Sequence, residues 1–388
     1  MIKLVKHSFY NEKNVKEKLA EFVLNTDIFS MGAQCSLFEK MFAEKQGSKN
    51  AVFVSSGSSA NLVLIQALLN LGRLKKGDRV GVSALTWATN VMPIIQLGLT
   101  PVLLDCEMET LNVSENILRL AHESSPLKAL FLTNVLGFCD NIQRISEYCV
   151  LNDILFFEDN CESLGTEVFG KKLGGFGVAG TFSTFIAHHL STIEGGMICT
   201  DDDSLYEMVL MVRAHGWSRN LSSQRRLDLQ TEHNVDPFYA PYTFFDLAYN
   251  ARPTEIQGFI GTQEIVHWDE IVKIREINFK KFHEATLSNP EIYPLNVEHI
   301  DVVSNFAMPL IFKTKEVCEK YKNKFLEAGV EMRPVIAGNI GRQPFYTKYF
   351  GSPELCPNAD KIHECGFYFG NSPHLTNEEV SQLCDLIK

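Results

Sequence analysis

Ala51-Val-Phe-Val-Ser55-Ser-Gly57-Ser-Ser-Ala-Asn61 is the stretch of this sequence that most directly indicates its fold. An apolar run typical of a buried strand passes straight into serines, a glycine and a helical stretch that extends from Ser58 to Leu71. The alternation continues downstream. Strands are expected at 78–82, 101–104, 128–133, 154–158, 180–185 and 197–200, and helices at 90–97, 114–122 and 142–151. The chain is therefore predicted to be an α/β protein with a mostly parallel sheet and helices on both faces.

The two ends of the chain follow a different pattern. Residues 10–27 have apolar positions at helical spacing and predict an amphipathic helix. After a long helical stretch from about residue 255 to 290, strand and helix signals resume, and Thr376-x-x-Glu379 is a capping box that opens a final helix. We expect two domains: an N-terminal arm with a large domain over 1–255, and a connecting helix with a small α+β domain over 256–388.

The composition excludes several classes of protein. Of 388 residues, 45% are hydrophobic, and the net charge is −11, so a nucleic-acid or membrane partner is not expected. No apolar run approaches the roughly 18 residues of a membrane helix, and the N-terminus lacks the apolar core of a signal peptide. The 10 cysteines form neither C-x-C nor C-x-x-C, which argues against a disulfide scaffold, an iron–sulfur cluster and a zinc site. A cytoplasmic protein with reduced thiols is expected.

The serine-rich turn is the first candidate binding element. Backbone N–H groups at the start of a helix attract an anion, Gly57 allows close approach, and serine hydroxyls can add donors. An ordinary serine-capped helix is the alternative, and the motif alone favours it.

Two further motifs follow apolar strands. Asp159 lies within Glu158-Asp-Asn-Cys-Glu162, at the carboxyl end of a strand, where open α/β sheets bind ligands. A loop acid or a helix cap is an equal alternative. Ser183 begins a segment that continues through His188-His189 to a Glu194-Gly-Gly turn. Either histidine alone would more often be structural.

Taken together, these motifs resemble those of the sugar aminotransferase family of pyridoxal-phosphate enzymes, which have the aspartate aminotransferase-type fold. The resemblance covers nearly the whole chain and includes Phe29-Ser-Met-Gly32 and Ala248-Tyr-Asn-Ala-Arg-Pro-Thr-Glu255. It implies that Asp159 pairs with the pyridine nitrogen of the cofactor. It also implies a set of phosphate-binding residues, namely Gly57, Ser58 and Ser183.

The same resemblance implies three more contacts to the cofactor. Trp87 falls where an aromatic ring stacks on the cofactor, with a core aromatic as the alternative. Glu162 replaces a glutamine usual in the family and should lie near the phenolic oxygen of the cofactor. Asn250 falls at the position that reaches the phosphate of the neighbouring subunit, which implies a homodimer.

His188 stands where the family has the lysine that holds the cofactor covalently. A histidine cannot form that link, but it can move protons near neutral pH. The exchange marks a subset of the family, the 4-keto-6-deoxy-sugar 3-dehydratases. The resemblance therefore implies non-covalent pyridoxamine 5′-phosphate, alternating with pyridoxal 5′-phosphate, and His188 as the catalytic residue. His189 is the competing base, and it should point the other way if the segment is extended.

The implied substrate is a nucleotide-linked 4-keto-6-deoxy sugar, with GDP-4-keto-6-deoxy-D-mannose expected and L-glutamate as the amino donor. An acidic chain needs local cations to bind a nucleotide diphosphate. The candidate cations, chosen because they match the family motifs, are His215, Arg219 and Arg333. Any single arginine is more often a solvated surface residue. The polar segment 221–240 is predicted to be a long loop. A nucleotide-sugar C4 aminotransferase and a non-catalytic relative remain as alternatives.

Overall fold

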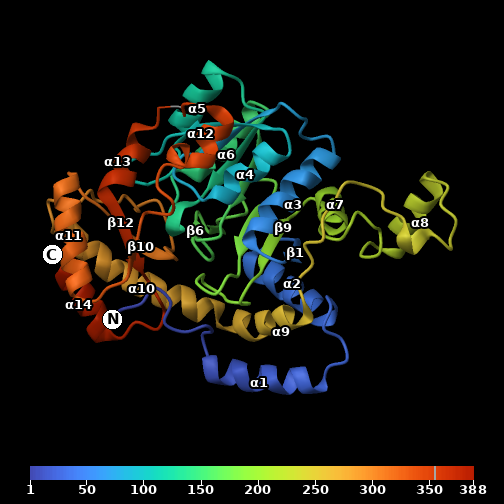
Figure 1. The fold of residues 1–388 in the computed structure, drawn as a ribbon, viewed down its shortest axis with the longest axis horizontal. Helices are drawn as coiled ribbons and strands as arrows, with labels where there is room; N and C mark the ends of the chain where they lie inside the picture. The colour runs from blue at the N-terminus through green and yellow to red at the C-terminus, as the bar shows by residue number, and fades with distance from the viewer. Residues whose placement is uncertain (354) are drawn as a thin grey trace.

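The structure is a computed structural model that describes residues 1–353 and 355–388. Within these residues, seven strands form one sheet in the order β1-β9-β8-β5-β4-β2-β3 (Figure 1). These strands are β1 (Asn50–Val54), β2 (Arg79–Ser83), β3 (Thr100–Leu104), β4 (Ala129–Thr133), β5 (Leu155–Asp159), β8 (Gly180–Ser183) and β9 (Gly196–Thr200). Strand β9 is antiparallel to both of its neighbours, and the strands from β8 to β3 are parallel. The predicted mostly parallel sheet is confirmed.

Helices cover both faces of this sheet, and β4 and β9 are therefore buried at every position. The helices of this part of the chain are α2 (Ala33–Gln46), α3 (Gly57–Asn70), α4 (Ala88–Gln96), α5 (Glu115–Ser124), α6 (Ile142–Leu151) and α7 (Asp203–Arg213). Helix α3 packs against β8, β9, α4 and α7, whereas α2 packs against β1. The turn between β1 and α3 is therefore held against the end of β8.

A smaller antiparallel sheet follows in the order β10-β12-β11. Its strands are β10 (Ala307–Ile311), β11 (Met332–Arg333) and β12 (Gly366–Gly370), and its helices are α11 (Lys315–Glu327), α12 (Pro344–Phe350), α13 (Pro357–Cys365) and α14 (Asn377–Ile387). Thr376 and Glu379 form the predicted capping box at the start of α14. Ile2 pairs with Val330, so the N-terminal segment crosses to this smaller sheet.

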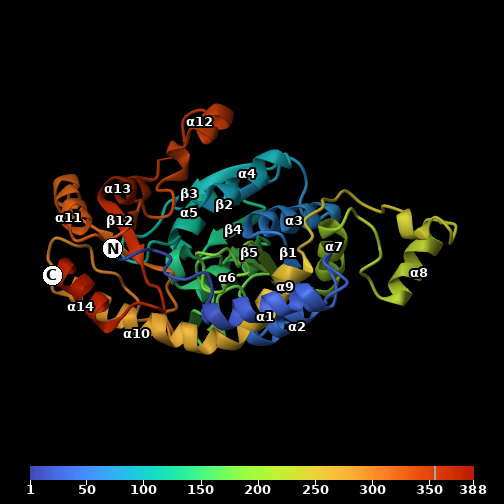
Figure 2. The same ribbon diagram turned by 60° about the horizontal axis from the view of Figure 1, so that its bottom comes forward.

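The helical stretch predicted after residue 255 consists of two helices. Helix α9 (Glu255–Glu264) and helix α10 (Trp268–Leu287) are separated by a short turn at Ile265–His267. Both run along one side of the molecule in Figure 2. The amphipathic helix expected near the N-terminus is α1 (Glu12–Asn25), which packs on α9.

The prediction of a long loop over 221–240 is wrong, because this segment contains helix α8 (Ser223–Glu232). The side chain of Ser222 accepts the N–H of Arg225 and caps the helix. Polar contacts along the helix support it, and Leu229 is its buried residue. Its apolar face is too narrow for hydrophobic periodicity to indicate a helix. The segment projects from the body as an arm, drawn in yellow-green in Figure 1.

No helix in the described part of the chain is both long enough and apolar enough to span a membrane.

Candidate active site

A cavity of about 550 Å³ opens at the carboxyl ends of the parallel strands. Several predicted site residues line it: Gly57, Ser58, Trp87, Asp159, Glu162, Ser183, His188 and Arg333. They come from four strand ends of the large sheet and from β11 of the smaller sheet, and the fold brings them into one space. The other three predicted residues, His215, Arg219 and Asn250, do not line it.

The serine-rich turn is both a helix cap and an open donor site. Ser56 is the N-cap of α3, and its hydroxyl and that of Ser59 satisfy each other's backbone N–H groups in a capping box. The neighbouring Ser58 is exposed. The N–H groups of the first helical turn have no partner within a helix, so Gly57 and Ser58 can donate to an anion. The two interpretations of the motif are therefore compatible.

The turn also requires a glycine. A Cβ atom placed on Gly57 would lie 2.7 Å from the Cβ of Ser183 and 3.0 Å from the Sγ of Cys161. Such separations are too short for non-bonded carbon and sulfur atoms. The backbone of Gly57 thus forms a close cradle against β8.

Glu162 is a half-buried residue that lines the same cavity. It accepts the N–H of Leu136 at 3.2 Å. Burial raises the pKa of Glu162 to about 8, and the nearby charge of Asp159 adds to the rise. Glu162 is therefore a neutral acid at neutral pH and can donate a hydrogen bond.

The two adjacent histidines differ in their access to the main cavity. His188 lines the main cavity, and its Nδ1 atom is buried without a hydrogen-bond partner among the described residues. His188 is half-buried, and its Nε2 atom is not among the buried atoms that lack a partner. The Nε2 atom of His189 lies 2.9 Å from the carbonyl oxygen of Ser304, and His189 does not line the main cavity. The geometry places His188 at the candidate site.

Burial sets the protonation state of His188. It lowers the pKa of this imidazole to about 4, and the charge of Arg275 contributes to the same shift. The rings of Phe185 and Phe306 lie edge-on to His188, with centroids 5.9 and 5.3 Å away. His188 is therefore a free base at neutral pH, held in an aromatic setting.

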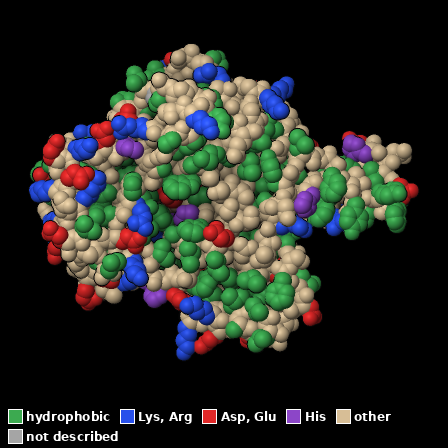
Figure 3. All heavy atoms as spheres, in the orientation of Figure 1, with side chains coloured by type: hydrophobic (Ala, Val, Ile, Leu, Met, Phe, Trp, Pro, Cys, Tyr) green, Lys and Arg blue, Asp and Glu red, His purple; other side chains and the backbone are tan. Residues whose placement is uncertain are grey.

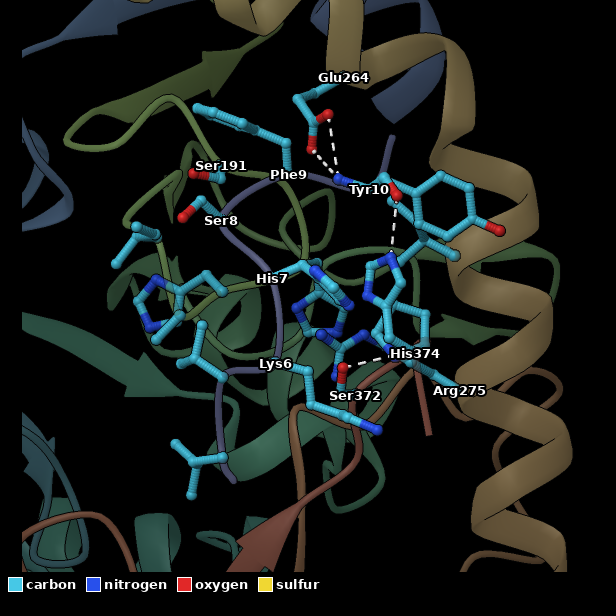
Figure 4. Close-up of a pocket in the computed structure, with 18 residues that line it drawn as sticks. Lys6, His7, Ser8, Phe9, Tyr10, Ser191, Glu264, Arg275, Ser372 and His374 are labelled. Carbon is cyan, nitrogen blue, oxygen red and sulfur yellow. Dashed lines mark hydrogen bonds between the residues drawn. The ribbon is translucent and has the colours of Figure 1, made fainter. Parts of the chain in front are cut away.

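A second cavity, of about 40 Å³, lies behind the two histidines (Figure 4). Arg275 reaches into it from α10, and the N-terminal segment Leu4–Tyr10 forms much of its wall. The backbone N–H of Tyr10 donates to the carboxylate of Glu264, and the ring of His374 bonds to the carbonyl of Tyr10. These contacts hold the N-terminal segment over the rear of His188.

The three predicted residues outside the cavity lie at or near the base of the projecting arm. The guanidinium of Arg219 lies 3.9 Å from the centre of the Trp217 ring, and its Nε donates to the carbonyl of Pro241 at 2.6 Å. His215 packs edge-on against Trp217, at 5.0 Å. Asn250 is exposed and accepts from Arg252 at 3.0 Å. A single chain does not bring them to the candidate site.

The structure also adds residues that the sequence did not reveal. Glu331 lines the cavity, bonds to Arg333 and accepts the N–H of Leu4 at 2.9 Å. Glu331 lies two residues before Arg333 on an extended segment, so the two side chains point to the same side. This spacing is the feature of the sequence that could have indicated Glu331. Asn90, Phe306 and Tyr368 also line the cavity, but they belong to no recognisable motif.

The sequence and the structure of this chain resemble those of known proteins. Residues 11–388 match the DegT/DnrJ/EryC1/StrS aminotransferase family. The chain belongs to this family. A GDP-4-keto-6-deoxy-D-mannose 3-dehydratase of Yersinia pseudotuberculosis is 35% identical over 94% of this chain and 93% of its own length.

Two solved structures of GDP-4-keto-6-deoxymannose-3-dehydratase also resemble this DegT/DnrJ/EryC1/StrS family member. One contains a trapped adduct of pyridoxal phosphate and glutamate, with a TM-score of 0.91 at 32% identity. The other is a histidine-to-asparagine variant with bound GDP-perosamine, with a TM-score of 0.89 at 31% identity. Each alignment covers 100% of both chains.

The cavity of this family member fits a pyridoxal-phosphate-type cofactor. The cradle at Gly57 suits a phosphate, Asp159 can accept from a ring nitrogen, and neutral Glu162 can donate to a phenolic oxygen. The side chain of Trp87 is 56% exposed, which leaves a ring face available. The Oδ1 atoms of Asn90 and Asn134 are buried without partners in the described residues, as expected of a site built for a polar ligand. None of the described residues that line the cavity is a lysine.

Proposed function

We propose that this chain is a pyridoxamine-phosphate-dependent 3-dehydratase. It removes the C3 hydroxyl of GDP-4-keto-6-deoxy-D-mannose to give a 4-keto-3,6-dideoxy sugar, and L-glutamate regenerates the pyridoxamine form of the cofactor. The observation that carries the proposal is His188, a free base facing a cofactor-shaped cavity at the family's lysine position. The matches to proteins named as this dehydratase support it.

Within this proposal the residues of the chain have distinct tasks. When bound, the cofactor supplies an electron sink that makes loss of a hydroxyl next to a ketone accessible. His188 accepts a proton at Nε2 and returns a proton to the departing hydroxyl, which its free-base state permits. Asp159 holds the ring nitrogen, and neutral Glu162 donates toward the phenolic oxygen. Trp87 supports the ring face.

Charged residues at the cavity mouth recognise the nucleotide sugar. Arg333 is the cation of the cavity wall, and its pairing with Glu331 keeps the guanidinium at the edge of the site. A guanidinium suits the oxygens of a diphosphate because it offers parallel donors. His215 and Arg219 supply further donors from the arm of a second chain.

We infer that the working form is a homodimer. Asn250, His215 and Arg219 do not line the cavity of their own chain. The arm that follows Arg219 carries exposed aromatic side chains. Phe238 is 81% exposed and Tyr242 is 72% exposed. Figure 3 shows hydrophobic side chains along the arm and also over α2. Exposed apolar patches of this kind are typical of interaction surfaces.

The dimer predicts complementation between two inactive variants. His188→Asn disables the base of one chain, and Asn250→Ala removes the side chain given to its partner. After co-refolding, half of the dimers should be mixed and hold one intact site, so the mixture should regain about a quarter of the wild-type rate. No recovery in mixtures shown to contain mixed dimers would contradict the shared site.

The pKa values of two site residues predict the pH dependence of turnover. Because burial lowers the pKa of His188 to about 4, kcat/KM should fall only as the pH drops toward that value. Because burial raises the pKa of Glu162 to about 8, this residue loses its proton as the pH rises, and kcat/KM should fall again. Glu162→Gln, which cannot ionise, should remove only the alkaline limb. An acid limb at the ordinary histidine value of 6.5 would contradict the assignment of His188.

The location of the enzyme is proposed from its thiols. No disulfide joins the cysteines of the described residues, and most of these side chains are buried. Free thiols are typical of a reducing compartment, which supports a cytoplasmic enzyme.

Product mass tests the proposed function. The enzyme is incubated with pyridoxamine phosphate, glutamate and 4-keto-6-deoxy sugars linked to GDP, CDP or dTDP. The GDP-linked sugar should yield a product one oxygen atom lighter than the substrate. A product in which an amino group replaces the ketone oxygen would instead show a C4 aminotransferase, and an unchanged substrate in all three arms would contradict a dehydratase.

A further inference from the structure

Two buried asparagines converge on one oxygen atom of Asp159. Asn61 on α3 and Asn90 on α4 each donate through Nδ2 to Asp159 Oδ2, both at 2.8 Å. The backbone N–H of Cys161 donates to the other oxygen, Oδ1, at 2.9 Å. Both asparagine side chains are 1% exposed. Three donors thus surround a carboxylate that has no cationic partner among the described residues.

The orientation of Asn61 is fixed by a further bond. The hydroxyl of Thr181, on the neighbouring strand β8, donates to Asn61 Oδ1 at 2.6 Å. The opposite orientation of the amide would turn its oxygen toward the carboxylate and lose both bonds. Asn90 lacks such support, because its Oδ1 atom is buried without a partner in the described chain. The position of the Asn90 amide is therefore determined by its bond to Asp159.

We propose that Asn61 and Asn90 are positioning residues that hold Asp159 as an acceptor-only carboxylate with Oδ1 left open to the cavity. Two side-chain donors occupy Oδ2, so a proton there would displace one of them. Oδ1 has a single backbone donor and retains a free lone pair. The inference rests on the proposed function, because the group that uses this lone pair is the ring nitrogen of the cofactor.

The positioning role predicts a change in cofactor binding that can be measured without turnover. Asn90→Asp keeps the shape of the side chain, but it replaces a donor with a second carboxylate beside Asp159. Like charges at this separation repel, so one of the two acids should take up a proton. Binding of pyridoxamine phosphate should weaken at least tenfold at alkaline pH and partly recover as the pH falls. Asn90→Leu should weaken binding at every pH.

The experiment compares these two variants with the wild type and with Asn116→Leu. Asn116 is exposed on α5, where it accepts from Arg119, and its replacement should leave binding unchanged. Cofactor affinity is measured by fluorescence titration, and the absorption band of the bound cofactor is titrated against pH to report the ring-nitrogen proton. In Asn90→Asp that band should titrate at higher pH than in the wild type, because an added negative charge favours the protonated ring.

Wild-type affinity and an unshifted band in Asn90→Asp would overturn the positioning role. Asn90→Asp is nearly isosteric, so it provides the test even if Asn90→Leu fails to fold. Failure of the unaltered chain to bind pyridoxamine phosphate would overturn the proposed function and the inference with it. Normal wild-type binding with unaffected variants would overturn the inference alone.

Discussion

Replacing His188 by asparagine should lower the rate of dehydration by about 10²–10⁴-fold, the usual contribution of a positioned acid or base. Asparagine cannot take up a proton at neutral pH, whereas the imidazole of His188 is a free base there because burial lowers its pKa to about 4. Its Nδ1 atom has no hydrogen-bond partner among the described residues, so the replacement breaks no hydrogen bond at that atom. Binding of pyridoxamine phosphate should therefore be retained, which fluorescence titration of the purified variant would show.

The adjacent histidine provides the matched control. His189→Asn alters a residue that bonds to Ser304 and faces away from the main cavity. Its replacement should reduce stability by about 1–3 kcal/mol, the cost of disturbing a buried hydrogen bond, and retain most of the dehydration rate. Substantial dehydration by His188→Asn, or a greater loss in His189→Asn, would show that the roles are reversed.

Replacing Asp159 by asparagine should lower turnover by about 10²–10³-fold, the range observed when one preorganised electrostatic group is removed. An amide has no negative charge with which to hold a protonated ring nitrogen. It would also place an NH₂ group or a neutral oxygen against the amides of Asn61 and Asn90, which now donate to the carboxylate. Turnover and cofactor affinity should fall together, measured by steady-state kinetics and fluorescence titration.

Asp153→Asn is the control for this change. Asp153 has a 96% exposed side chain and pairs with Lys128 at the surface. Its replacement should alter stability by no more than about 0.5 kcal/mol and leave turnover unchanged. Unaltered turnover in Asp159→Asn would remove this carboxylate from the mechanism.

The large sheet could be predicted because its strands carry their own signal. Each of these strands contains a short apolar run followed by a turn, and the runs match β1 to β5 within one or two residues. Helix α2 was not anticipated. Its buried residues include Cys35, Phe38 and Phe42, but the exposed Leu37 interrupts the apolar stripe, so the helical period is weak. Helix α8 was not predicted because its polar composition gives little hydrophobic periodicity.

The site was predictable only where it lies on continuous motifs. Gly57, Asp159 and His188 each follow a strand of the sheet, so the topology alone brings them to one edge. Glu331 and Phe306 reach the cavity from the ends of strands in the smaller sheet, and Leu4 does so from the N-terminal segment. These positions depend on long-range packing that no local pattern encodes. In the proposed homodimer, His215 and Asn250 would reach the site from a second chain, which the sequence of one chain does not place.

The fate of the amino nitrogen tests the central claim most directly. The enzyme is supplied with the GDP-linked 4-keto-6-deoxy sugar and with glutamate carrying a heavy nitrogen isotope, and the label is followed by mass spectrometry. A dehydratase uses glutamate only to restore its cofactor, so the label should appear in free ammonia and be absent from the sugar. Label retained in the sugar product would contradict the account, because it would show that the chain transfers the amino group.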